Sequence, residues 1–369
     1  MAAILGGRRE NLFHQLAHLP QPFWMVNIME MFERFAYYGV RVVIPIYIAQ
    51  ADEPGGLHFT QAEKGLIFAL WAAVQAGVPV FSGGFADRYG YKRTIAVSVA
   101  ITMTGYILMG TQREFWPFTF GCLVLAFGTA IFKPGLQGTL VRQLNKDNSS
   151  MGWGSFYMLV NIGGFLGPPL AHFLHGISWP AVFFGCAAIA SLNFLMLFTY
   201  RSVPSGADLT ESWLKVAGRT FRNLFQTRLL AFIGIMSGFW LMFMQLFDML
   251  PNFIVDWVDS SAIVRTFHLP AMFTTETPRG TMIAQEWMIN ANAGLIVLAV
   301  VWVSWLVSRM RRVTSIFIGI TIASVGLALA GFTMSGWLCI LGILCFSTGE
   351  MLSSPKMNDY LGVIAPEGK

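Results

Sequence analysis

The chain has 369 residues, of which 55% are hydrophobic, 14% are aromatic and only 12% are charged, and its formal net charge is +5. A soluble domain carries about 25% charged residues, so this composition excludes an ordinary soluble protein. Apolar runs of about 20 residues recur along the chain, which predicts an all-α polytopic membrane protein and not a β-barrel. Because Lys and Arg lie mostly in short loops, the positive charge does not indicate nucleic-acid binding.

The apolar runs predict ten membrane-spanning helices. Lys and Arg are concentrated before the first span and in every second loop after it, so the positive-inside rule predicts a cytosolic N-terminus. The predicted spans are 23–50, 63–86, 93–112, 116–141, 152–175, 178–200, 229–257, 283–308, 312–333 and 337–362.

A longer basic segment, residues 201–228, separates six spans from four. Its apolar residues Trp213, Phe221 and Phe225 fall on one helical face, which predicts an interfacial helix that joins two bundles. The expected domains are an N-terminal six-helix bundle (1–200), a cytosolic interfacial linker (201–228) and an incomplete C-terminal bundle of four helices (229–369).

The first span contains the sequence EMFERFAYYGVR, whose charges are unusual in an apolar segment. Glu30, Glu33, Arg34, Tyr37 and Arg41 are spaced as i, i+3, i+4, i+7 and i+11, so they share one helical face. A charged side chain at the bilayer centre costs at least about 2.5–3.5 kcal/mol on insertion scales. This face is therefore predicted to point into the interior of a helix bundle.

Three further charges are predicted inside spans: Lys133 in the fourth, Asp248 in the seventh and Glu350 in the tenth. Together with the first span they make four acids and three bases. This near balance predicts a paired network around a water-filled cavity, where a carboxylate could bind and release a proton. The alternative is a static set of salt bridges that only holds helices together, although buried ion pairs stabilise less than apolar packing does.

The loop after the second span carries GGFADRYGYKR, which resembles the loop signature of the major facilitator superfamily. A weaker copy, LVSRMRRVTSIFIG, follows the eighth span, as expected for duplicated six-helix halves. The resemblance implies a gating role for Asp87, Arg88 and Arg93. It also implies twelve spans, so we expect a sequence that is truncated before the last two.

Several motifs resemble those of the proton-coupled oligopeptide transporter (POT) family of this superfamily. Besides the first-span motif they are FGTAIFKPG, GSFYMLVNIGGFLGP, FWLMFMQ and GEMLSSP. The resemblance implies proton-coupled symport of di- and tripeptides by alternating access, with the proton gradient as energy source and no cofactor. The implied partners are a small peptide, protons and the lipid bilayer, and the expected form is a monomer in the plasma membrane.

The resemblance also implies roles for individual residues. Arg41 and Lys133 would face the peptide carboxylate, and Glu350 would receive its α-amino group. Proton coupling is implied for Glu30, Glu33, Arg34 and Asp248. The implied substrate-binding residues are Arg41, Tyr37, Tyr38, Lys133, Asn161, Trp240, Asn292 and Glu350.

The sequence departs from the family at two positions in particular. Met244 stands where the family has an acid four residues after the seventh-span Trp240; Asp248, one turn further on, could take its place. Ala76 stands where polar or aromatic residues are common. Two alternatives therefore stay open: a transporter of another solute, and a non-transporting membrane protein or fragment. The sequence has no phosphate-binding loop, metal-ligand cluster or nucleophile–base pair, so we expect neither a metal site nor an enzyme.

Overall fold

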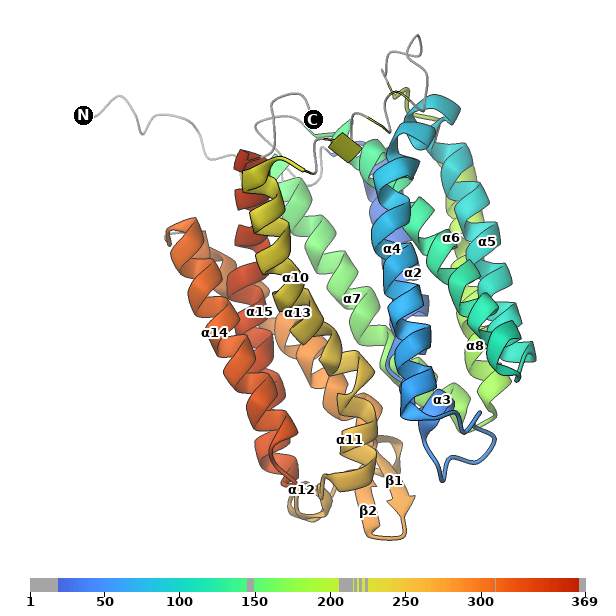
Figure 1. The fold of residues 1–369 in the computed structure, drawn as a ribbon, viewed down its shortest axis with the longest axis vertical. Coiled ribbons are helices and arrows are strands. Elements are labelled where there is room, and N and C mark those ends of the chain that lie inside the picture. The colour runs from blue at the N-terminus through green and yellow to red at the C-terminus, as the bar shows by residue number, and fades with distance from the viewer. Residues whose placement is uncertain are drawn as a thin grey trace.

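The computed structural model describes residues 19–144, 149–205 and 225–364 except 309, together with a few isolated positions between 206 and 224. Long helices run nearly side by side, and the start of the first described helix and the end of the last lie toward the same end of the molecule (Figure 1). The helices are α2 (Gln21–Arg41), α3 (Ile44–Ala49), α4 (Gln61–Tyr89), α5 (Tyr91–Thr111), α6 (Phe115–Val141), α7 (Ser149–His175), α8 (Trp179–Phe198), α10 (Thr227–Asp248), α11 (Leu250–Trp257), α12 (Ser261–Phe267), α13 (Gln285–Ser308), α14 (Arg312–Gly331) and α15 (Gly336–Ile364).

Each predicted span corresponds to helix in the structure, and two spans are broken. The first span divides into α2 and α3 just before Pro45, and the seventh divides into α10 and α11 just before Pro251. Proline lacks the N–H that a continuous helix needs, but it fits the first turn of a new helix. By length and hydropathy, six of the described helices could cross a membrane, or seven if the bent α4 counts as one span.

Helices α2 and α4–α8 pack on one another around two apolar clusters, and α10, α11 and α13–α15 pack around a third. Glycines allow the closest approaches: a Cβ added at Gly105 would lie 2.5 Å from the backbone nitrogen of Leu125, and one added at Gly128 would lie 2.5 Å from Thr102 Oγ1. Close contact through small residues is a common way to pack helices in membranes. Helix α13 also packs on α7, so the two groups of helices touch.

The segment between α11 and α13 has more structure than the simple loop that the sequence predicted. It contains α12, the 3₁₀ helix η1 (Ala271–Phe273), and a hairpin of β1 (Thr274–Thr277) with β2 (Gly280–Ile283), in which Thr274 pairs with Ile283. Gly280 has φ +113°, a conformation that glycine adopts without strain at the hairpin turn.

The predicted interfacial helix within 201–228 falls mostly on residues outside the described part of the chain. The division into two domains at this linker therefore stays a prediction.

Candidate functional site

A cavity of about 630 Å³ lies between α2, α4, α6 and α7 on one side and α10 and α15 on the other. Three of these helices supply its charged lining residues. Among the residues predicted as functional, those that line the cavity are Arg34, Tyr37, Tyr38, Lys133, Asn161, Trp240 and Glu350.

The basic wall of the cavity is backed by buried carboxylates. Arg34 Nη2 donates a hydrogen bond to Glu33 Oε1 at 2.6 Å, and Arg34 Nε lies 3.3 Å from Glu30 Oε1. Lys133 Nζ donates to the same oxygen of Glu30. Glu30 is completely buried, and its second carboxylate oxygen has no hydrogen-bond partner. Three residues of the predicted stripe, Glu30, Glu33 and Arg34, thus form a network with Lys133 of α6, and of these four charged residues only the two bases line the cavity.

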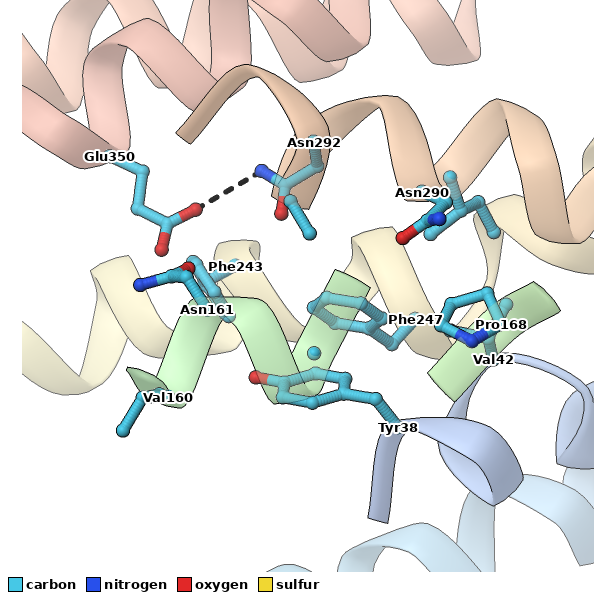
Figure 2. Close-up of a pocket in the computed structure, with 13 residues that line it drawn as sticks. Tyr38, Val42, Val160, Asn161, Pro168, Phe243, Phe247, Asn290, Asn292 and Glu350 are labelled. Atoms are coloured by element: carbon cyan, nitrogen blue, oxygen red, sulfur yellow. Dashed lines mark hydrogen bonds between the residues drawn. The ribbon is translucent and has the colours of Figure 1, made fainter. Parts of the chain in front are cut away.

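The opposite wall carries an acid. Glu350 of α15 is buried, and its Oε2 accepts a hydrogen bond from Asn292 Nδ2 at 3.1 Å (Figure 2). Asn292 also donates to Ser347 Oγ at 2.9 Å, which orients the amide toward the carboxylate. Within the described residues, Glu350 forms no ion pair with Lys or Arg. This carboxylate could therefore accept a cationic group from a bound molecule.

Arg41 and Asp248 do not line the cavity, although the sequence placed one with the substrate and the other with the proton. They form a salt bridge to each other, between α2 and the end of α10. The Arg41 guanidinium also stacks 4.4 Å from the centre of the Phe68 ring. The structure therefore places both residues in a contact between the two groups of helices, at the end where α3 and α11 lie (lower part of Figure 1).

Sequence reasoning missed a second cation at this contact, Lys64 of α4, which is only 2% exposed. Its Nζ donates to the backbone oxygen of Asp248 at 3.0 Å and to Asn252 Oδ1 at 2.7 Å. Nearby, Gln50 Nε2 donates to Asp256 Oδ1 at 2.6 Å. These contacts join the two groups of helices at this end of the molecule. We call the residues that make them the outer contact cluster: Arg41, Gln50, Lys64, Asp248, Asn252 and Asp256.

Lys64 was overlooked because it lies in the first turn of α4, where a charged residue is ordinarily a solvated helix end. Thr60 and Glu63 form a capping box there. The sequence pattern thus located the helix start correctly but gave no signal that this turn is covered by α11.

The predicted gating residues lie at the turn between α4 and α5, away from the cavity. Gly90 separates the two helices with φ +92°, which favours glycine. Tyr91 OH donates to Asp87 Oδ1 at 2.6 Å, and Lys92 Nζ donates to the backbone oxygen of Tyr200 at 2.8 Å. Arg88 and Arg93 flank the same turn. Their gating role stays a prediction.

The sequence analysis also missed several polar residues that line the cavity, among them Gln75 and Tyr157. Gln75 of α4 donates to Thr129 Oγ1 at 3.0 Å, and Tyr37 OH donates to Gln75 Oε1 at 3.4 Å. Tyr157 of α7 lines the cavity as well. An isolated Gln inside an apolar span is the kind of signal that could have identified the first of them.

Comparison with known proteins supports the fold. Residues 26–369 match the family model described as Major Facilitator Superfamily. The Dipeptide and tripeptide permease B of Aliivibrio fischeri is 28% identical over 195 residues, which are 51% of this chain and 38% of that protein. The Peptide transporter YePEPT of Yersinia enterocolitica is 26% identical over 211 residues, which are 53% of this chain and 40% of that protein. The matched region therefore covers well under half of the length of these relatives.

Solved structures superpose over nearly the whole chain. A POT family transporter in complex with a thioalcohol-conjugated peptide matches with a TM-score of 0.73 at 17% identity, covering 94% of this chain and 85% of the other. A POT family transporter in complex with 5-aminolevulinic acid matches with a TM-score of 0.68 at 17% identity, with the same coverage of each chain. The sequence predicted an all-α membrane fold and a resemblance to the POT family of the major facilitator superfamily. Both the fold and the resemblance are confirmed.

Proposed function

Because the chain belongs to the major facilitator superfamily, we propose that it carries di- and tripeptides across the membrane together with protons. The observation that carries this proposal is the charge distribution in the cavity. Bases from α2 and α6, Arg34 and Lys133, line one wall, and Glu350 of α15 lines the other without an ion-pair partner among the described residues. A short peptide has a carboxylate at one end and an ammonium group at the other, so it matches both walls.

The termini and the backbone are the groups that all short peptides share. Tyr37, Tyr38 and Asn161 line the cavity between the two charged walls and could hydrogen-bond the peptide backbone. Side-chain-tolerant binding follows, because none of these contacts depends on the identity of the peptide's residues. Trp240 lines the same cavity and would close over the bound molecule. Asn292 would act through Glu350, which it orients.

Proton coupling follows from the network behind the basic wall. Lys133 contacts Glu30, and Arg34 contacts both Glu30 and Glu33. A peptide carboxylate that binds these bases would compete with the glutamates for them. A buried carboxylate without its partner is costly, so binding a proton becomes favourable at that moment. Substrate binding and proton binding would thus support each other.

Transport also requires that the outer contact cluster opens. Asp248 is the residue for which we propose proton binding at this end, because a neutral side chain would weaken its salt bridge with Arg41. We further propose a plasma-membrane location with a cytosolic N-terminus, so that the described conformation is closed toward the outside. We also propose that the monomer is the functional form, and neither a cofactor nor a catalytic residue is part of the proposal.

The proposal is tested by uptake of a labelled dipeptide into proteoliposomes with and without an inward proton gradient. We expect gradient-driven uptake that the Glu33→Gln variant loses. Glu114→Gln is the matched control, because Glu114 is exposed at the start of α6 and its side chain makes no capping hydrogen bond. Uptake that ignores the gradient in the wild-type protein would contradict the proposal.

A transporter of a different zwitterion or anion is the second candidate. It is favoured by Met244, which lines the cavity where related sequences are expected to carry an acid. A panel of unlabelled amino acids, peptides and organic anions, tested as competitors, separates the two candidates. Competition by non-peptide solutes alone would favour the second.

A further inference from the structure

A second, smaller cavity of about 40 Å³ adjoins the main one (Figure 2). Residues of α2, α7, α10 and α13 line it, together with Glu350 of α15. It shares five lining residues with the main cavity, Tyr38, Val160, Asn161, Phe243 and Glu350, so a molecule bound in the main cavity could extend a group into it. We call this space the side cavity.

The side cavity contains an unused hydrogen-bond acceptor. Asn290 of α13 is 3% exposed, and its Nδ2 donates to the backbone oxygen of Phe165 at 3.0 Å. This bond holds the amide in one orientation, and its Oδ1 is buried without any hydrogen-bond partner. Figure 2 shows the Asn290 carboxamide with its oxygen on the side of Asn292 and Phe247. Buried polar atoms are nearly always paired, so an orphaned oxygen in a cavity wall indicates a missing donor.

The other walls limit what can enter. Val42, Pro168, Phe247 and Ile289 make much of the lining apolar. Gly164 contributes only backbone to the lining. A Cβ added there would lie 3.3 Å from the Tyr38 ring, so the backbone of α7 and this ring are already close together on this side of the cavity. A cavity needs a volume of roughly 10–15 Å³ to hold one water molecule, so the side cavity has room for only a few atoms. The side cavity could therefore hold a methyl or hydroxymethyl group but not an isobutyl or benzyl group.

We propose that the side cavity receives the side chain of the peptide's first residue, and that Asn290 selects small side chains with a hydroxyl group, such as that of Ser. The inference depends on the proposed function, in which Glu350 binds the α-amino group. Glu350 forms one wall of the side cavity, so the α-carbon of the first residue lies at its entrance. The hydroxyl of Ser would then donate to Asn290 Oδ1, while the methyl group of Ala fills the space without a hydrogen bond.

The test is competition against a labelled Ala-Ala dipeptide that binds purified protein in detergent. We expect Ser-Ala to compete about two- to tenfold better than Ala-Ala, the range of one neutral hydrogen bond. Leu-Ala and Phe-Ala should compete more weakly than Ala-Ala. Ala-Ser should equal Ala-Ala, because the second side chain lies elsewhere.

The Asn290→Ala variant should bring the ratio of Ser-Ala to Ala-Ala to about one. Both peptides are measured on the same protein, so a general loss of affinity cancels from this ratio. Asn27→Ala is the matched control: Asn27 is buried, donates to a backbone oxygen at 2.7 Å and also has an unpartnered Oδ1, but it lines neither cavity. This control should keep the wild-type ratio.

A second variant tests the same cavity without changing Asn290, in case the Asn290→Ala protein does not fold. Ala293→Val adds two methyl groups to the lining of the side cavity and should weaken Ser-Ala and Ala-Ala relative to Gly-Ala. If wild-type protein binds Ser-Ala and Ala-Ala equally, water satisfies Asn290 and the inference is overturned. If the labelled dipeptide does not bind folded protein at all, the proposed function itself fails.

Discussion

The outer contact cluster offers a direct test of how the cavity is closed. Asp248→Asn removes the carboxylate that Arg41 contacts and leaves two buried cations, Arg41 and Lys64, beside it. Removing one partner of a buried ion pair costs about 3–5 kcal/mol. Asn can still accept a hydrogen bond, and Arg41 keeps its contact with the Phe68 ring. We therefore expect a smaller loss, in which the substitution destabilises the closed arrangement by about 2–3 kcal/mol. The equilibrium should therefore shift away from this closed arrangement by about 30- to 150-fold.

The shift can be measured as a distance between spin labels on Pro54→Cys and Pro278→Cys. Both positions line a cavity of about 1030 Å³ at this end of the molecule, Pro54 in the loop between α3 and α4 and Pro278 in the turn between β1 and β2. The wild-type protein should show one short distance, and Asp248→Asn should add a longer one. Asp256→Asn is the matched control, because it keeps an oxygen for Gln50 and breaks no ion pair. If folded Asp248→Asn protein shows only the wild-type distance, the cluster does not hold this end closed.

Three further predictions concern affinity, packing and pH. Glu350→Gln should weaken dipeptide binding about 10- to 150-fold in a titration of purified protein, because a charge-assisted hydrogen bond contributes about 1.5–3 kcal/mol. Gly128→Ala should lower the thermal unfolding temperature by forcing a Cβ against Thr102, with a cost of about 1–3 kcal/mol, whereas Gly77→Ala, with nothing within 4 Å, should not. Outside the spans, hydrogen bonds from the serine two residues later lower the pKa of Asp259. Asp259 should therefore stabilise the folded protein above its ordinary pKa, and this stabilisation should be lost as the pH falls through the lowered pKa. The measurement is unfolding of the wild-type protein and of Asp259→Asn across acidic pH. The variant should lack this pH-dependent loss of stability.

The first-span stripe shows what the sequence could predict about the site. The spacing of Glu30, Glu33, Arg34, Tyr37 and Arg41 predicts one face inside a bundle, and each of these side chains is buried or lines the cavity in the structure. The cost of a charge in lipid leaves no other place for such a face. The helices themselves follow from hydropathy in the same way.

The partners of these residues could not be predicted from spacing. Arg41 contacts Asp248, which is 207 positions away in the chain, and Lys133 contacts Glu30, which is 103 positions away. Such pairs depend on how whole helices pack, and helical periodicity gives only the face of each helix. The family resemblance implied that Arg41 and Lys133 both face the peptide carboxylate, whereas the structure places Lys133 in the cavity wall and Arg41 in the outer contact cluster.

Asn290 shows a different limit. The resemblance implied a role for Asn292 and none for Asn290. Two side chains at positions i and i+2 also point to different sides of a helix, so a pattern based on one face does not join them. In the structure both line the side cavity, one toward Glu350 and the other toward α7. A space enclosed by several helices can use side chains from a wide arc of one of them, which a single-face pattern does not predict.

The central claim is that peptide and proton move together, and proton movement can be observed directly. Proteoliposomes that contain a pH-sensitive dye are prepared without a pH gradient and with a membrane potential that is negative inside, and a saturating dipeptide is then added outside. The account predicts internal acidification that depends on the peptide and that the Glu33→Gln variant lacks. Peptide uptake without any acidification would contradict it.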